Sequence, residues 1–152
     1  NPPADAQESW QTPLVIPAAD FKTTGEDPEG HYFAAGGYVT GDGVNNAMVA
    51  PIYLPNGATV ERVEARIRDD SDSCGSNADI QVQLDRVNYG DGVYENMGYA
   101  TSSGSSSSMQ TIPDDTIANA TINNWVYSYW VHVHFCSALH EVYSVVVYYT
   151  GG

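Results

Sequence analysis

Tyr127–Phe135 (YSYWVHVHF) is the stretch that decides the fold. Its residues alternate between an apolar and a mainly polar series, which is the period-two pattern of a β-strand that buries one face. The apolar series is Tyr127, Tyr129, Val131, Val133 and Phe135, and the opposite series is Ser128, Trp130, His132 and His134. A few residues later, Val142–Tyr149 is apolar on both faces. We therefore expect this second run to lie in the middle of a sheet that is covered on both sides.

Alternation of the same kind marks two stretches further upstream. In Arg62–Arg68 every second residue is aliphatic and the others are charged, and in Ile80–Asp85 aliphatic residues alternate with Gln81, Gln83 and Asp85. Clusters of Gly, Pro, Asn, Asp and Ser separate such runs and predict turns. We predict strands over 32–40, 47–54, 60–68, 78–87, 94–101, 116–122, 126–135 and 141–150, and a serine-rich loop over 102–108. Short strands without long helices predict an all-β fold, an antiparallel β-sandwich of jelly-roll type.

Length and charge restrict the number of domains and the partners. A chain of 152 residues fits one domain, so we expect an N-terminal arm over 1–20 and a single sandwich over 21–152. Nineteen acidic against five basic residues give a formal net charge of −14. Nucleic acids and anionic membrane surfaces are therefore not expected as partners, because both require clustered positive charge.

The composition also predicts where the protein works. Only 16% of the residues are charged, so Ser, Thr, Asn, Gln, Gly and Tyr must supply most of the polar surface, as is common in secreted and fibre-forming proteins. The chain begins at Asn1 without an initiator Met, which fits either a mature end left by a signal peptidase or a trimmed chain. We expect a secreted protein, extracellular or at the cell surface.

Two cysteines, Cys74 and Cys136, allow a single intramolecular pairing. In an oxidising compartment this bridge would close a loop of about 60 residues and contribute on the order of 4 kcal/mol. Two buried free thiols are the alternative, and we predict the disulfide. A candidate for modification is Asn119, which begins an N-glycosylation sequon that matters only if the source cell glycosylates exported chains.

The N-terminal arm contains a short apolar strand that carries two prolines, Pro13 and Pro17. N–H groups alternate sides along a strand, so prolines four residues apart remove donors from the same edge and leave the other edge able to pair. The candidate contact residues of this strand are Trp10, Thr12, Leu14, Val15 and Ile16.

Two arrangements satisfy this pattern. In the first, the arm folds back as an edge strand of its own sandwich, and the prolines protect that edge against further pairing. In the second, it crosses to a neighbouring copy and fills an apolar groove there, which is β-strand addition between chains. A head-to-tail contact of this kind propagates into a filament. We favour the second arrangement, in which the protein is the structural subunit of an extracellular filament made of copies of itself.

Signals for metal ions and for catalysis are weak. His132 and His134 lie about 7 Å apart on one strand face, a spacing that metal-binding jelly rolls use, but the glutamate that such sites need does not follow at the right distance. Asp69–Asp72 offers oxygen ligands for calcium, and solvated turn carboxylates are the simpler interpretation. A nucleophilic serine motif such as G-x-S-x-G is missing. We expect no cofactor, no metal ion and no enzymatic activity.

Several motifs together resemble secreted bacterial β-sandwich domains of jelly-roll type. They are Val49–Ile52, Leu54–Val60, Tyr127–Tyr129 and the final apolar run Val142–Tyr149. The resemblance covers about residues 30–149 and implies the fold without an activity. With its arm, the chain is also similar in architecture to fibre subunits that donate a terminal strand, which implies copies of itself as partners.

Aromatic side chains support a second hypothesis. The chain has 11 Tyr and 3 Trp residues, and exposed planar side chains on a sandwich stack against sugar rings. Trp125 and Trp130 are the candidate stacking residues. The alternative to the filament is therefore a secreted carbohydrate-binding β-sandwich module whose partners are glycans.

Overall fold

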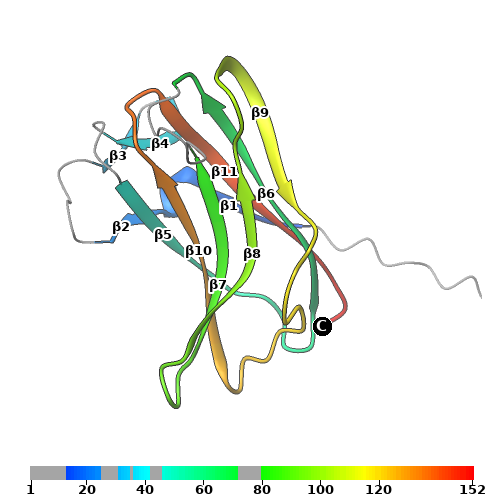
Figure 1. The fold of residues 1–152 in the computed structure, drawn as a ribbon. Helices are drawn as coiled ribbons and strands as arrows, with labels where there is room; N and C mark the ends of the chain where they lie inside the picture. The colour runs from blue at the N-terminus through cyan, green and yellow to red at the C-terminus, as the bar shows by residue number, and fades with distance from the viewer. Residues whose placement is uncertain (1–12, 25–30, 35, 42–45, 72–79) are drawn as a thin grey trace, which may run out of the picture.

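Alternating apolar side chains give this chain strands in nearly all of its regular structure. The computed structural model describes residues 13–24, 31–34, 36–41, 46–71 and 80–152. The strands are β1 (Leu14–Pro17), β2 (Lys22–Thr23), β3 (His31–Ala34), β4 (Tyr38–Gly41), β5 (Asn46–Ile52), β6 (Thr59–Asp69), β7 (Gln81–Asn88), β8 (Tyr94–Thr101), β9 (Ser106–Asp114), β10 (Tyr127–Phe135) and β11 (His140–Thr150), with one 3₁₀ helix, η1 (Ala18–Asp20). They form two antiparallel sheets that pack face to face (Figure 1). The predicted antiparallel β-sandwich is confirmed.

One sheet is built around β11 and has the order β3-β4-β11-β6-β9. β11 pairs with β6 along one edge, and its other edge is shared by β4 at Val142 and by β1 from Ser144 to Val147. Val145 faces the core at 0% exposure, and Val146 on the opposite face is only 7% exposed. The run that is apolar on both faces therefore lies mid-sheet, as predicted.

The other sheet has the order β2-β5-β10-β7-β8, with β10 in the middle between β5 and β7. The alternation expected for β10 holds. Tyr129, Val131, Val133 and Phe135 are buried against the first sheet, whereas Ser128, Trp130, His132 and His134 lie on the opposite face. We call this solvent side of the sheet the outer face.

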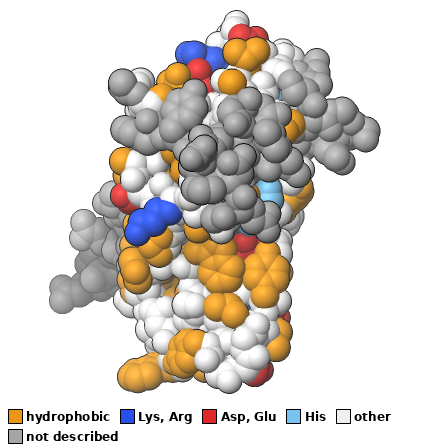
Figure 2. Space-filling view, turned by 90° about the vertical axis from the view of Figure 1, so that its left-hand side faces the viewer, with side chains coloured by type: hydrophobic (Ala, Val, Ile, Leu, Met, Phe, Trp, Pro, Cys, Tyr) orange, Lys and Arg blue, Asp and Glu red, His pale blue; other side chains and the backbone are white. Residues whose placement is uncertain are grey.

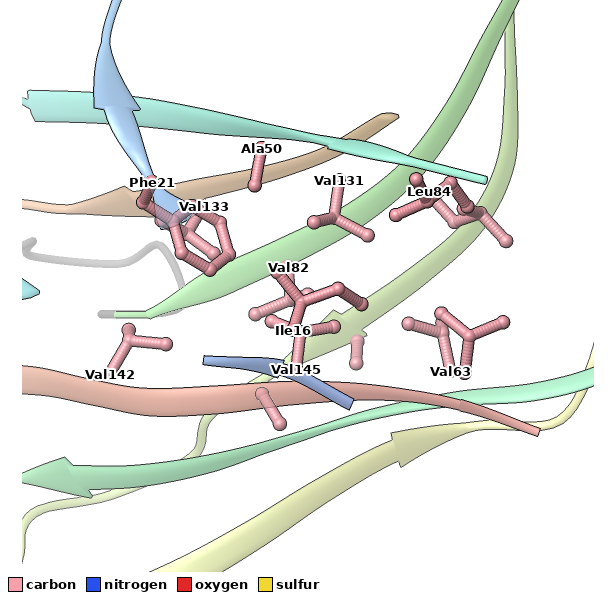
Figure 3. Close-up of a cluster of buried hydrophobic side chains, with 14 of the residues drawn as sticks. Ile16, Phe21, Ala50, Val63, Val82, Leu84, Val131, Val133, Val142 and Val145 are labelled. Carbon is pink, nitrogen blue, oxygen red and sulfur yellow. The ribbon is translucent and has the colours of Figure 1, made fainter. Parts of the chain in front are cut away.

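The core lies between the two sheets and consists mainly of β-branched and aliphatic side chains. Such side chains are stiff in strands and pack well on a pleated surface. In Figure 3, labelled side chains of the first sheet point toward those of the second. The first group is Ile16, Val63, Val142 and Val145, and the second is Ala50, Val82, Leu84, Val131 and Val133.

The N-terminal strand β1 lies in the sheet of its own chain, where it pairs with β11. Leu14 pairs with Val147 of β11, and Ile16 is 3% exposed inside the core, while Val15 points outward at 54% exposure. The predicted donor strand is thus corrected to the first of the two arrangements. The physical reason is that β11 offers an open edge beyond β4, and the chain's own arm reaches it without the entropy cost of associating two molecules. Trp10 and Thr12 lie outside the described residues.

Two predicted strands have a different form. The range 32–40 is a hairpin, because β3 and β4 pair with each other across a turn at Gly36 and Gly37, where Gly37 has a φ of 85°. That backbone conformation suits glycine and strains other residues. The range 116–122 is a loop with a single bridge, from Thr121 to Thr59.

The serine-rich segment is partly strand. The range 102–108 was predicted as a loop, but β9 begins at Ser106, which pairs with Asp69 of β6. β9 is the edge strand of its sheet, so its outward side chains remain exposed and serine is compatible with strand pairing there.

Candidate functional site

The outer face gathers aromatic and polar side chains in rows that cross the strands. Cross-strand partners share one face of a sheet, so the pairing register defines each row. The rows are Tyr94–Val87–Ser128, then Asn96–Asp85–Trp130–Pro51, then Tyr99–Gln83–His132–Val49–Lys22, and then Thr101–Gln81–His134–Ala47. Rings, amides and imidazoles therefore lie side by side on one surface. This arrangement suits a ligand that has both apolar faces and hydrogen-bonding groups.

Asp85 lies beside an aromatic pair at the centre of the outer face. The rings of Tyr94 and Trp130 have centroids 5.8 Å apart, and Asp85 has an exposure of 0%. Asp85 Oδ1 accepts hydrogen bonds from Tyr94 Oη and Asn96 Nδ2, both at 2.9 Å. Asp85 Oδ2 has no hydrogen-bond partner among the described residues and lies 3.9 Å from His132 Nδ1. A buried carboxylate oxygen without a donor is costly.

Burial sets the protonation of this centre. It raises the pKa of Asp85, and the hydrogen bonds from Asn96 and Tyr94 oppose that rise. Burial, followed by the hydrogen bond to Asp85, also raises the pKa of Tyr94 to about 12. The phenol thus stays protonated and continues to donate to Oδ1 at neutral pH.

His132 and His134 stack on each other next to this centre, with ring centroids 4.1 Å apart. Burial lowers the pKa of both imidazoles; the pKa of His134 is lowered further by His132 and raised by Asp85. Both rings are therefore neutral at pH 7. His132 Nε2 is buried and lacks a hydrogen-bond partner in the described part of the chain.

Metal-binding geometry is not found at these histidines. Among the residues that the structure describes, no group of three His, Cys, Asp or Glu side chains is placed to hold a metal ion. His140, the third histidine near in sequence, belongs to the other sheet, where its Nε2 lies 3.3 Å from Asp69 Oδ1 and 2.9 Å from the carbonyl oxygen of Ser71.

The arginines form ion pairs with glutamates. Arg62 and Arg66 contact Glu64 at 3.4 and 3.3 Å, Arg68 contacts Glu141 at 3.2 Å, and Arg86 contacts Glu95 at 2.6 Å. Among the described residues in the rows of the outer face, the charged groups are the carboxylate of Asp85 and, at the far edge, the ammonium of Lys22. Since nothing there concentrates positive charge, the face is not built to hold an anionic ligand.

Trp125, the other predicted stacking residue, lies apart from Trp130. It is 80% exposed on the loop that precedes β10. This loop is fixed at one end of the sandwich, because Asn124 Nδ2 donates to the carbonyl oxygen of Leu54 at 2.8 Å and Tyr89 Oη donates to the carbonyl oxygen of Trp125. The structure thus assigns the two tryptophans to different surfaces.

The remaining predicted sites are placed as follows. Asn119 is exposed in a turn with a φ of 51°, and its glycosylation stays a prediction. Cys136 is not a free cysteine. Its expected partner Cys74 lies outside the described residues, so the bridge between them stays a prediction.

Sequence reasoning missed the contribution of β8 to the outer face. The alternation of β7 assigns Gln83 and Asp85 to the side opposite the aliphatic residues. It does not indicate which aromatic and amide side chains of β8 lie beside them. The pairing shifts between Leu84 and Asp85, where Asp85 lies opposite Asn96 and one residue of β8 is skipped. A bulge of this kind changes which side chains share a face, and the alternation of a single strand gives no signal of it.

No family model and no curated protein matches the chain, whereas solved structures do. The C-terminal family 6 carbohydrate-binding module of LamC, a marine laminarinase from Zobellia galactanivorans, is 13% identical with a TM-score of 0.52, over 92% of this chain and 100% of that one. The xylan-binding module CBM15 is 16% identical with a TM-score of 0.52, over 90% and 96%. CsCBM6-3 from Clostridium stercorarium, in complex with cellobiose, is 21% identical with a TM-score of 0.50, over 88% and 92%.

These likenesses show the fold. The chain has the same β-sandwich fold as these three solved modules.

Proposed function

We propose that this protein is a non-catalytic carbohydrate-binding module that binds a polysaccharide on its outer face. The observation that carries the proposal is the centre formed by Asp85, Tyr94 and Trp130. There the exposed ring of Tyr94 pairs with Trp130, and Asp85 Oδ1 holds Tyr94 Oη and Asn96 Nδ2 in place through hydrogen bonds of 2.9 Å. A sugar ring has C–H groups on its faces, which pack on aromatic rings, and hydroxyl groups on its rim, which donate to carboxylates. The shared fold supports the same proposal.

Each side chain of the centre has a defined part in this binding. Trp130 and Tyr94 supply the apolar surface for the face of the sugar, while Asp85 Oδ1 fixes the positions of Tyr94 and Asn96. His132, whose pKa is lowered, is neutral and supplies one acceptor and one N–H donor. Because Tyr94 and Asn96 already hold Asp85 in place, little ordering is needed on binding, and preorganisation of this kind favours affinity.

We further propose that the protein works outside the cell. Low charged-residue content and the expected bridge between Cys74 and Cys136 support an exported protein. In the described part of the chain, no helix is long and apolar enough to cross a membrane. Because β1 completes the sheet of its own chain, the structure gives no support to the filament.

Isothermal titration calorimetry with cellohexaose, xylohexaose and laminarihexaose tests the function. We expect the wild-type chain to bind at least one of them and Trp130→Ala to weaken that binding at least roughly tenfold, since a stacking surface is lost. Trp125→Ala is the matched control, because it removes a tryptophan from another surface, and we expect it to bind as the wild type does. Loss of binding in Trp125→Ala alone would move the site to the end of the sandwich. Absence of binding to all three sugars would refute the function.

A further inference from the structure

A groove runs along the side of the sandwich between β1 and β5. It encloses about 380 Å³, and its lining includes Val15, Asp20, Lys22, Pro51, Ile52 and Tyr53. A volume of this size is typical of sites for small ligands. Figure 2 looks onto the side of the molecule where β2 and β5 lie. It shows hydrophobic side chains gathered below the grey residues, with a basic side chain beside them.

The groove exists because two strand edges face each other without pairing. β2 pairs with β5 at Met48 and Val49 only, so the last residues of β5 have no partner strand on that side among the described residues. β1 uses its competent edge for β11, and the prolines Pro13 and Pro17 reduce pairing along its other edge. A space lined by strand edges and apolar side chains therefore remains open.

The groove is continuous with the outer face. Pro51 lines the groove and is also the cross-strand partner of Trp130. Lys22 lines it as well and ends the row that contains His132. Tyr53 lies just beyond β5, is 84% exposed and lines the same groove. A polysaccharide chain that extends from the aromatic pair across the strands toward β5 would therefore reach the groove next.

We propose that the groove is an additional subsite, which holds the continuation of the polysaccharide chain that lies on the outer face; this inference rests on the proposed function. Neighbouring strands are about 4.8 Å apart, so the path from β8 to β5 measures about 14 Å. One strand spacing is close to the length of one sugar unit, and about three units cover this path. The groove is occupied only by a longer chain.

The lining of the groove defines the chemical class of these further units. Most of it is aliphatic or aromatic, and its formal charges are one carboxylate, Asp20, and one ammonium, Lys22, which cancel. An uncharged sugar fits this balance, with its C–H face on Tyr53 and Pro51 and its hydroxyl groups toward the two charged groups. A uronic acid in the groove would be attracted by Lys22 and repelled by Asp20.

Titration calorimetry with a short and a long probe tests the subsite. The probes are the tri- and hexasaccharides of cellulose, xylan and laminarin, and the series used is the one whose hexasaccharide the wild-type chain binds. Ala19→Arg extends a long side chain from an exposed groove position into the groove, and Tyr53→Ala removes its exposed ring. We expect each variant to bind the hexasaccharide about tenfold more weakly and the trisaccharide unchanged. Ala19→Ser is the matched control and should bind both probes as the wild type does.

The possible outcomes separate the subsite from the function. Hexasaccharide binding that is unchanged in both variants, or tri- and hexasaccharide binding that falls equally, would overturn the groove subsite while leaving the outer face intact. A wild-type chain that binds none of the hexasaccharides would overturn the function, and the subsite with it. Thermal unfolding of each variant confirms that an effect on binding does not come from loss of the fold.

Discussion

Two donors hold Asp85 through its Oδ1. Its Oδ2 has no hydrogen-bond partner among the described residues. Tyr94 and Asn96 satisfy Oδ1, and the surrounding rings exclude water from the carboxylate. Since burial raises its pKa, the charged form is less stable in the folded chain than in water. A group that lowers stability in this way is typical of a binding site, where a ligand repays the cost.

Replacing Asp85 by Asn separates stability from binding. The amide oxygen still accepts from Tyr94 and Asn96, but no desolvated charge remains. We expect the free energy of unfolding in urea to stay equal or to rise by about 1 kcal/mol. Binding of the sugar should weaken about tenfold, because a neutral amide holds Tyr94 and Asn96 less firmly than the carboxylate does. A loss of several kcal/mol in stability would show that Asp85 is a structural residue instead.

The stacked histidines predict how stability depends on pH. The pKa values of His132 and His134 are lower in the folded chain than the ordinary 6.5. Below pH 6.5 the unfolded chain therefore takes up protons that the folded chain does not, and the free energy of unfolding falls as the pH falls. The raised pKa of Asp85 acts in the opposite direction as the pH falls toward it. Urea unfolding between about pH 5 and pH 7 measures the slope.

A double variant isolates the histidine contribution to that slope. His132→Gln combined with His134→Gln removes both imidazoles while keeping polar side chains on the outer face. We expect the free energy of unfolding of this variant to be flatter between pH 5 and 7 than that of the wild type. Equal slopes in the two proteins would assign the pH dependence to other groups.

Among the elements, β1 has only four residues but contributes to both the sheet and the core. It covers the edge of β11 that β4 leaves open, and it inserts Ile16 between the sheets. The two prolines allow pairing on one edge and reduce it on the other. One short strand therefore completes a sheet and forms a wall of the side groove.

The contribution of β1 to stability is measured by a matched pair of variants. Ile16→Ala deletes a side chain that is 3% exposed and should lower the free energy of unfolding by about 2–4 kcal/mol. Val15→Ala alters a neighbour that is 54% exposed and should change it by less than about 0.5 kcal/mol. Equal, small effects in urea unfolding would mean that β1 is detached from its sheet in solution.

Strands with clear alternation were predictable from the sequence, and their pairing was not. The pattern of β10 placed Trp130, His132 and His134 on one face, which is half of the candidate site. The other half comes from β8, and its alignment with Asp85 depends on a bulge that only the pairing of two strands reveals. β9 was missed because an edge strand has no need for apolar residues on its outward side.

Across the whole molecule, electrostatics narrow the choice of ligand. The chain carries a formal charge of −14, and its arginines contact Glu64, Glu95 and Glu141. A polysaccharide with carboxylate or sulfate groups would be repelled at long range and would find no cluster of cations on arrival. An uncharged polysaccharide is not repelled at long range and needs no cluster of cations for binding.

Affinity electrophoresis with paired polymers tests this selection. We expect the protein to be retarded by an uncharged polymer such as hydroxyethyl cellulose or xylan and not by its acidic counterpart, carboxymethyl cellulose or polygalacturonate. Binding to the uncharged polymer should change less than about twofold between 50 and 500 mM salt, because no ion pairs form. Stronger retardation by the acidic polymers, or loss of binding in salt, would contradict an uncharged ligand.

The pairing of Leu14 with Val147 brings the first and last strands of the fold together, in the sheet opposite the outer face. A tether attached to either strand therefore starts from the sheet that does not carry the outer face. A sensor chip, a fluorescent reporter or a catalytic partner joined there would leave the outer face pointing into solution. With the proposed carbohydrate binding, the same sandwich would hold such cargo on a polysaccharide surface.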